Sequence, residues 1–187
     1  MKKILVVIAV AAATLSVSAV ASGENYAGVG VGVSHGLQQQ DAGAGKVFLG
    51  AQFSQALAGE VSIVDLGQLG STTVRAVTLD TVLRSPAMSG TRGTFLLGRV
   101  GVTSWLAETD SSSRVVACHH APPPPPAPSP CAPTSETIPS VARRGTDFDL
   151  GVGVEHRITS DWRVRLEGTR YYGIDIVLGT LSLIGEF

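Results

Sequence analysis

Long apolar runs are missing from this sequence beyond its amino terminus. Outside the first 21 residues, no stretch approaches the ~18 consecutive apolar residues typical of a membrane-spanning helix. Extended helical periodicity is also absent, so the apolar residues have to be organised by strands. Because backbone polar groups in lipid must be satisfied within the protein, a spanning fold without helices has to be a closed β-barrel.

An excess of basic residues is also missing. The chain has 14 Lys and Arg against 15 Asp and Glu, and the amino-terminal 21 residues hold two lysines and no acid. Without that segment the net charge is near −3, which argues against nucleic acid as a partner. The remaining chain of about 165 residues fits a single domain.

Cysteine is scarce, and Cys118 and Cys131 both lie in one proline-rich stretch. In an exported protein, a disulfide between them is the leading interpretation. Free thiols, or a metal site with the neighbouring His119 and His120, remain alternatives. Structural zinc sites usually have closer cysteine pairs than these, which twelve residues separate. We therefore predict no metal and no cofactor.

The amino terminus predicts export. Lys2 and Lys3 form a positive segment, Ile4–Leu15 is a short apolar segment, and Ala19-Val20-Ala21 has the pattern of a cleavage site. A membrane-anchoring helix is the alternative, but the apolar segment is short and ends in small residues. We predict a signal peptide over residues 1–21 and one domain over residues 22–187.

Eight segments of the mature chain alternate between apolar and polar residues, with the period of two that is typical of strands. They cover residues 26–34, 46–53, 60–66, 74–84, 94–106, 147–158, 162–171 and 177–187. Charges concentrate on one face of strands whose other face is aliphatic. A soluble barrel would place its apolar face inside. The pattern therefore favours the inverse arrangement, an all-β fold with an eight-stranded antiparallel up-and-down transmembrane β-barrel.

The connections between these segments partly alternate in length. Residues 54–59 and 159–161 are short, as periplasmic turns should be, and residues 35–45 are long, as an external loop should be. The longest connection, at about residues 107–146, contains Pro122–Pro126. A proline run favours a stiff, extended segment. This segment either presents a surface to an external ligand or is simply solvated.

Nine charged residues fall on the inferred inward faces of the strands. They are Glu60, Asp80, Arg99, Asp149, Glu155, Arg157, Arg163, Arg165 and Glu167. Because an unpaired buried charge is costly, and because an eight-stranded barrel is just wide enough to be filled by its own side chains, we interpret them as a self-neutralising core. A gate or ion path is the alternative interpretation.

The last strand ends on a free aromatic residue, Phe187, and resembles the closing strand of bacterial outer-membrane barrels. Lys46–Phe53, Glu60–Gly67 and Gly98–Val102 resemble the second, third and fifth strands of the OmpA/OmpX-like outer-membrane β-barrel family. Gly151–Thr159, followed by Trp162 and Arg165–Glu167, resembles the hairpin of its sixth and seventh strands. The resemblance implies the outer membrane of a Gram-negative cell and contact with outer-membrane lipid and lipopolysaccharide. It also implies that Phe187 is an assembly signal read by the barrel-assembly machinery.

Three features depart from the family pattern. Gly185 stands two positions before the terminal residue, where the family usually has an aromatic residue. Aromatic residues make up only 5% of the chain, so the interfacial girdle is thin. The sequence also stops at Phe187, which leaves no room for a peptidoglycan-binding domain, so anchoring to the cell wall is not implied.

We therefore expect a structural or interaction protein, a monomeric barrel that displays external loops. A narrow small-solute or ion channel is the main alternative, and a lipid-modifying enzyme is a distant one. A hydrolase would need a nucleophile and a base on the lipid-facing wall. His156 faces outward, but its same-face neighbours Val154 and Ile158 are aliphatic and no orienting acid stands beside it. We predict that the protein is not an enzyme.

Overall fold

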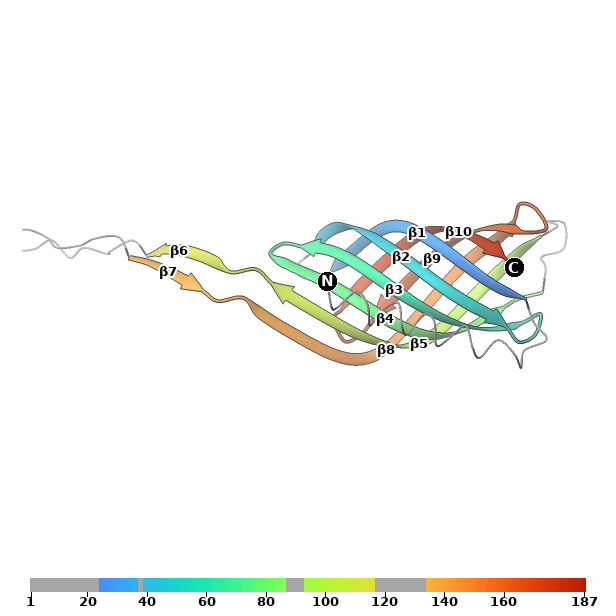
Figure 1. The fold of residues 1–187 in the computed structure, drawn as a ribbon, viewed down its shortest axis with the longest axis horizontal. Coiled ribbons are helices and arrows are strands. Elements are labelled where there is room, and N and C mark those ends of the chain that lie inside the picture. Colours follow the sequence, from blue (N-terminus) through green and yellow to red (C-terminus); the bar gives the residue numbers. More distant parts are fainter. Residues whose placement is uncertain (1–23, 37–38, 87–92, 117–133) are drawn as a thin grey trace, which may run out of the picture.

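The computed structural model describes residues 24–36, 39–86, 93–116 and 134–187, and eight of its strands form a closed antiparallel barrel (Figure 1). The barrel strands are β1 (Asn25–Gly36), β2 (Gln40–Gln52), β3 (Leu57–Leu69), β4 (Thr72–Arg84), β5 (Thr94–Thr109), β8 (Val141–Arg157), β9 (Trp162–Tyr171) and β10 (Ile176–Glu186). Two short strands, β6 (Ser112–Val116) and β7 (Thr134–Ile138), pair with each other outside the barrel. In the described part of the chain, no helix has the length and apolarity needed to cross a membrane.

Each barrel strand pairs with the next barrel strand of the chain, and β1 pairs with β10 to close the ring. The closing ladder runs from Tyr26 opposite Glu186 to Gly36 opposite Ile176, so no edge of the sheet is left along this seam. The predicted eight-stranded up-and-down barrel is confirmed.

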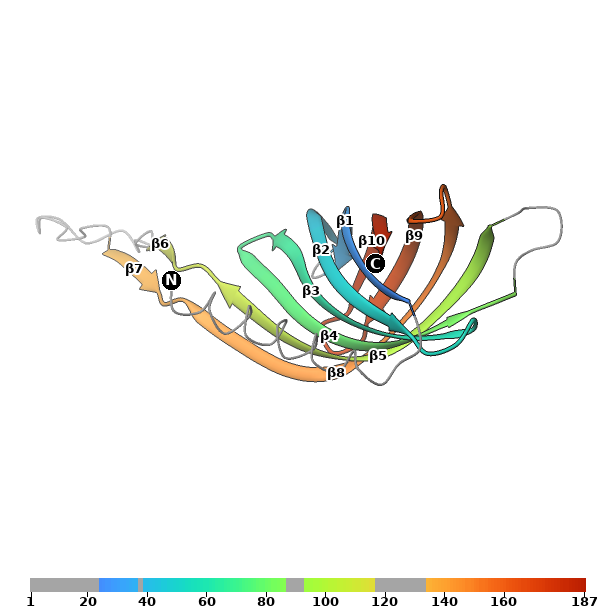
Figure 2. The ribbon, with the colours of Figure 1, turned by 45° about the vertical axis from the view of Figure 1, so that its right-hand side comes forward.

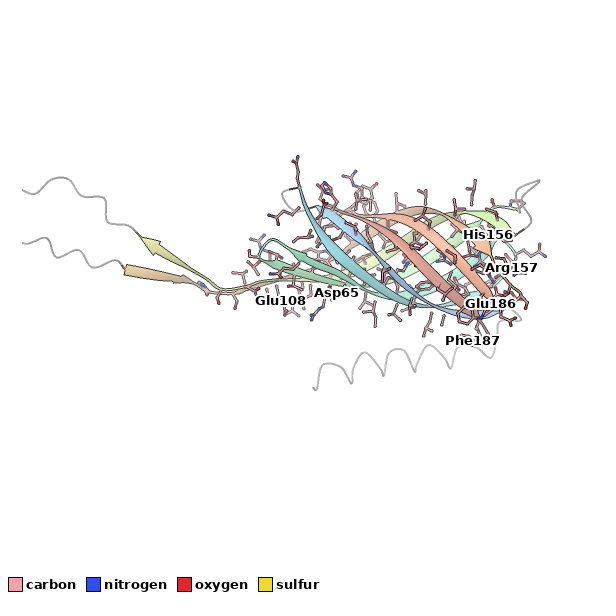
Figure 3. All side chains as sticks on the ribbon, turned by 90° about the horizontal axis from the view of Figure 1, so that it is seen from above. Asp65, Glu108, His156, Arg157, Glu186 and Phe187 are labelled. Atoms are coloured by element: carbon pink, nitrogen blue, oxygen red, sulfur yellow. The ribbon has the colours of Figure 1, made fainter. Side chains whose placement is uncertain are left out.

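The side chains are arranged inside out relative to a soluble protein. Aliphatic side chains cover the outer wall, with Val31 70%, Leu79 65% and Val152 71% exposed, and Figure 3 shows side chains standing outward around the ribbon. Charged side chains such as Arg165 and Glu60 are instead 1% exposed inside the barrel. This is the arrangement that the alternation of charged and aliphatic faces predicted.

Two glycine positions explain how large rings fit inside so narrow a barrel. A Cβ atom at Gly28 would lie 2.2 Å from the ring of Phe48, and one at Gly50 would lie 2.1 Å from the ring of Tyr26. The repeat of glycine and valine in β1 therefore has a simple reason. Its valines face lipid and its glycines leave room in the lumen for side chains from neighbouring strands.

The first external connection is much shorter than predicted. We expected a loop over residues 35–45, but β1 and β2 stay paired as far as Gly36 opposite Gln40. The segment Gln40–Gly45 consists of small and polar residues, so it lacks the alternation that marks a strand. Backbone hydrogen bonds to β1 form the strand without that pattern, because ladder bonds need no particular side chain.

The described parts of the predicted long loop at residues 107–146 are also mostly strand. β5 continues to Thr109, β8 starts at Val141, and β6 and β7 prolong the same hairpin away from the barrel (Figures 1 and 2). We call the segment from Asp110 to Ser140, together with the protruding ends of β5 and β8, the external ribbon. Its proline run, Pro122–Pro126, lies outside the described residues.

Both ends of the barrel's chain lie at the same mouth. Figure 3 shows Arg157, Glu186 and Phe187 at this end and Asp65 and Glu108 toward the other. The short turns after β2 and β8 close the mouth that holds the termini, where Phe53 N donates to Leu57 O over 2.9 Å and Ile158 N donates to Trp162 O over 2.9 Å. The external ribbon projects from the opposite mouth.

Candidate functional site in the barrel lumen

Among the described residues, ten charged side chains are buried in the lumen, and their charges cancel. The cations are Lys46, Arg84, Arg99, Arg163 and Arg165, and the anions are Glu60, Asp80, Asp149, Glu155 and Glu167. Alternation along each strand brings them to one face, and barrel closure brings that face together in the lumen. Charges taken out of water need partners at close range, so the contacts between them matter more than their number.

Glu60 on β3 is the acceptor at the centre of this network. Its carboxylate accepts from Arg165 over 2.7 Å and from Arg99 over 3.1 Å, and it lies 3.2 Å from Lys46 Nζ. The hydroxyl of Tyr26 donates to it over 3.3 Å. Four strands other than β3 therefore contribute donors to one carboxylate.

Arg99 on β5 contacts three further carboxylates of the network. Its guanidinium donates to Glu167 over 3.0 Å, forms an ion pair with Asp80, and lies 3.8 Å from Asp149. It also donates to Thr78 Oγ1 over 3.0 Å. Charge-assisted hydrogen bonds of this kind hold a planar guanidinium in one orientation, so the network fixes the relative positions of the strands.

Glu155 on β8 forms a second centre, nearer the mouth that holds the termini. It lies 3.1 Å from Arg84, 2.9 Å from Arg163 and 3.0 Å from Arg165. One carboxylate thus faces three guanidinium groups. Arg165 has Glu60 as a further partner, whereas Arg84 and Arg163 depend on groups near the mouth.

The external half of the lumen is apolar. Nine buried residues form one cluster there: Val64, Leu66, Leu69, Val74, Ala76, Tyr171, Ile174, Ile176 and Leu178. Along β3 the inward residues change from Glu60 and Ser62 to Val64 and Leu66 on the way to the external mouth. The charge network is therefore covered by an apolar layer on its external side, and the described lumen is filled with side chains.

Eight of the nine charged residues assigned to the inward faces are buried in the structure, and Arg157 differs. Its side chain is 44% exposed and its Nη2 atom lies 3.7 Å from Glu186. Arg157 is the last residue of β8, so it reaches past the wall to the mouth (Figure 3). The alternation of residues along a strand predicts which face a side chain is on. It does not predict how far along the barrel axis that side chain lies.

Lys46 and Arg84 belong to the network but were missing from the assigned set. Both alternate with aliphatic neighbours on their strands, so the same signal could have found them. Phe187 is 69% exposed at the terminal mouth, where its N–H donates to Asn25 O over 3.0 Å. The predicted signal peptide, Cys118 and Cys131 lie outside the described residues.

The outer wall offers little for catalysis or metal binding in the described part of the chain. His156 is exposed, and its Nδ1 atom lies 2.9 Å from Thr94 Oγ1. No group of three or more His, Cys, Asp or Glu side chains among the described residues is placed to hold a metal ion.

Aromatic side chains on the outer wall gather toward its two ends. Trp162 stands opposite Gly185, and its ring comes within 3.4 Å of the position that a Cβ atom at Gly185 would take. Trp162 thus covers the space beside the glycine that replaces the family's usual aromatic residue. Toward the external end, Phe148 and Tyr172 stack with ring centroids 4.4 Å apart.

Comparisons with known proteins agree with this geometry. The model of the outer membrane protein beta-barrel domain family matches residues 5–180. Neisserial surface protein A (NspA) has a similar structure with a TM-score of 0.57 and 7% identity, covering 88% of this chain and 97% of that one. A comparison with curated proteins found no match.

Two further solved structures have the same fold. The N-terminal β-barrel domain of Pseudomonas aeruginosa OprF gives a TM-score of 0.50 at 12% identity, covering 89% of this chain and 100% of that one. Ail, the attachment invasion locus protein of Yersinia pestis, gives 0.50 at 16% identity, covering 88% and 97%. With a closed barrel, a lipid-compatible outer wall and a family match over most of its length, this chain belongs to the outer-membrane β-barrel protein family and is a protein of the outer membrane.

Proposed function

We propose that the barrel is a monomeric anchor that presents the external ribbon to a partner outside the cell. The observation that carries this proposal is the unequal length of neighbouring strands. β9 ends at Tyr171 opposite Asp149, whereas β8 begins at Val141. Within the described residues, Val141 to Asp147 therefore have no partner strand on the β9 side.

An open strand edge offers unpaired backbone N–H and C=O groups to an extended partner. Arg143 and Arg144 lie on this edge and are exposed. Their charge favours a partner with acidic groups, because oxyanions suit the guanidinium fork. The Ail structure named above was solved in complex with the heparin analogue sucrose octasulfate, and this supports testing a sulfated probe here.

The experiment is binding of the refolded mature chain to immobilised heparin in detergent. We expect the native chain to be retained at low salt, and a variant with Arg143→Gln and Arg144→Gln to elute at clearly lower salt. Arg170→Gln is the matched control, because Arg170 is also exposed and lies toward the external end but is paired with Asp175. Equal elution of native chain and double variant would contradict an anion-binding ribbon.

The outer wall supports a second part of the proposal, contact with lipopolysaccharide. Arg75 is 63% exposed on the outer wall, toward the external end of the aliphatic band. Phosphate groups of an outer-leaflet glycolipid would lie at this level. Arginine is suited to them because its planar fork binds phosphate in a bidentate manner.

A channel is the alternative that the sequence left open, and the packing of the lumen favours the anchor instead. Charged side chains there contact one another at hydrogen-bonding distance, and an apolar cluster covers them on the external side. A conducting path would have to pass both layers.

A further inference from the structure

A cavity of about 720 Å³ opens at the mouth of the barrel that holds the termini. Three arginines, Arg84, Arg157 and Arg163, line it together with Gln52 and the rings of Phe53 and Phe95. The longest connection, the external ribbon, leaves the other mouth, and long loops of outer-membrane barrels are extracellular, so the cavity faces the periplasm. We call it the periplasmic vestibule.

The carboxylates that neutralise the three arginines of the vestibule lie mostly behind its lining. Among the described residues of the lining, Glu24 is the one carboxylate; it lies 3.7 Å from Arg163, and its side chain is 63% exposed, so water screens it strongly. Behind the lining, Glu155 is shared between Arg84, Arg163 and Arg165. Glu186 contacts Arg163 and lies 3.7 Å from Arg157. The three lining arginines therefore share two carboxylates with limited access to solvent.

Some N–H donors of the lining arginines also lack a hydrogen-bond acceptor. The Nε atoms of Arg84 and Arg163 are buried and have no hydrogen-bond partner among the described residues. Their side chains are only 4% and 2% exposed, so water does not solvate them freely. Gln52 Oε1 already accepts from Arg84 Nη1 over 2.5 Å, which leaves the amide NH₂ of Gln52 as a further donor.

We infer that the periplasmic vestibule binds an oxyanion, a phosphate or carboxylate group carried by a small soluble molecule of the periplasm. One such group accepts from donors of the lining arginines, of which Arg84 and Arg163 are held in place by Glu155. Phe53 and Phe95 give the cavity an apolar side for the rest of the molecule. The lumen above the vestibule is filled, so the ligand enters and leaves through the periplasmic mouth.

The test uses the refolded mature chain in lipid nanodiscs, titrated with inorganic phosphate and separately with citrate at constant ionic strength. Amide chemical shifts are followed by NMR at Gln52 and Ser85, and at Gly173 near the external mouth. We expect saturable shifts at Gln52 and Ser85 with either anion or with both, and none at Gly173. Which anion saturates identifies the oxyanion that the vestibule prefers.

Arg157→Gln is the first variant, because Arg157 is exposed and its loss should leave the buried network intact. We expect it to weaken the binding of the anion at least about 5-fold, whereas Arg170→Gln at the external end leaves binding unchanged. The Arg84→Gln variant, checked for folding by its heat-shifted band, should weaken binding as well. Shifts that never saturate, or that are equal in native chain and Arg157→Gln, would show a general salt effect only and overturn the site.

Discussion

Arg165 on β9 donates to Glu60 on β3 over 2.7 Å, and these two strands lie on opposite sides of the barrel. In the ring of eight strands, three others separate β9 from β3 in either direction. Their side chains therefore meet across the width of the lumen, with 1% and 0% of their side-chain surface exposed. The pair acts as a strut that links opposite walls, and it shows why the lumen cannot stay open at this level.

The contact between Arg165 and Glu60 predicts that a single substitution at Glu60 will greatly lower the stability of the barrel. Glu60→Gln leaves Arg165, Arg99 and Lys46 around a neutral amide, so we expect unfolding to become easier by about 3–5 kcal/mol. Urea unfolding of the refolded barrel in detergent measures this change. Asp65→Asn on the same strand is the control, because Asp65 is exposed and its pair with Arg75 contributes about 0–1 kcal/mol. A shift for Glu60→Gln no larger than that for Asp65→Asn would rule out the strut.

The position of the Tyr26 ring predicts that alanine substitutions at two glycines of β2 will differ in their effect on stability. A methyl group at Gly50 would overlap that ring, whereas one at Gly45 would meet no atom within 4 Å. We expect Gly50→Ala to destabilise the barrel by about 1–3 kcal/mol, as overpacking does, and Gly45→Ala to change little. The temperature at which the compact band disappears from SDS gels compares the two variants. If the compact bands of both variants disappeared at the same temperature, the Tyr26 ring would not be packed tightly against Gly50.

The filled lumen predicts low conductance. In planar bilayers, we expect no stable channel steps from the native chain at neutral pH. Replacing parts of the external apolar cluster, as in Leu66→Ser with Leu178→Ser, should introduce current because polar side chains admit water. Regular steps from the native chain would favour the channel interpretation.

Phe187 predicts an assembly defect. Deleting this residue removes the exposed ring that follows β10 and the hydrogen bond from the Phe187 N–H to Asn25 O, but it leaves the closing ladder in place. We expect less protein in the outer membrane and more precursor or degraded protein in the periplasm, measured by fractionation and immunoblotting at native expression. Phe53→Ala, which removes another exposed ring at the same mouth, should assemble normally. Unchanged levels after deletion of Phe187 would mean that the terminal residue is not the signal.

Strand alternation predicted the barrel and most of its interior, because one residue in two on each strand must face the lumen. Glu155 and Arg165 were assigned from this pattern, and the structure places them in contact. The pattern could not show that Glu155 serves three arginines, because those partners come from two other strands, β4 and β9, whose register relative to β8 is set by pairing. It also missed the start of β2 at Gln40, where backbone pairing extends the strand through small and polar residues.

The central claim is that a closed barrel anchors the external ribbon outside the cell. Trypsin treatment of intact cells tests this claim most directly. Arg143 and Arg144 are exposed on the part of β8 that pairs with β5 but extends beyond β9, whereas Arg99, Arg163 and Arg165 are buried. The account predicts rapid cleavage in the ribbon of intact cells, with the remaining barrel still running as a compact, heat-sensitive band. If the ribbon were cut only after the outer membrane is made permeable, it would face the periplasm, and the proposed function would be contradicted.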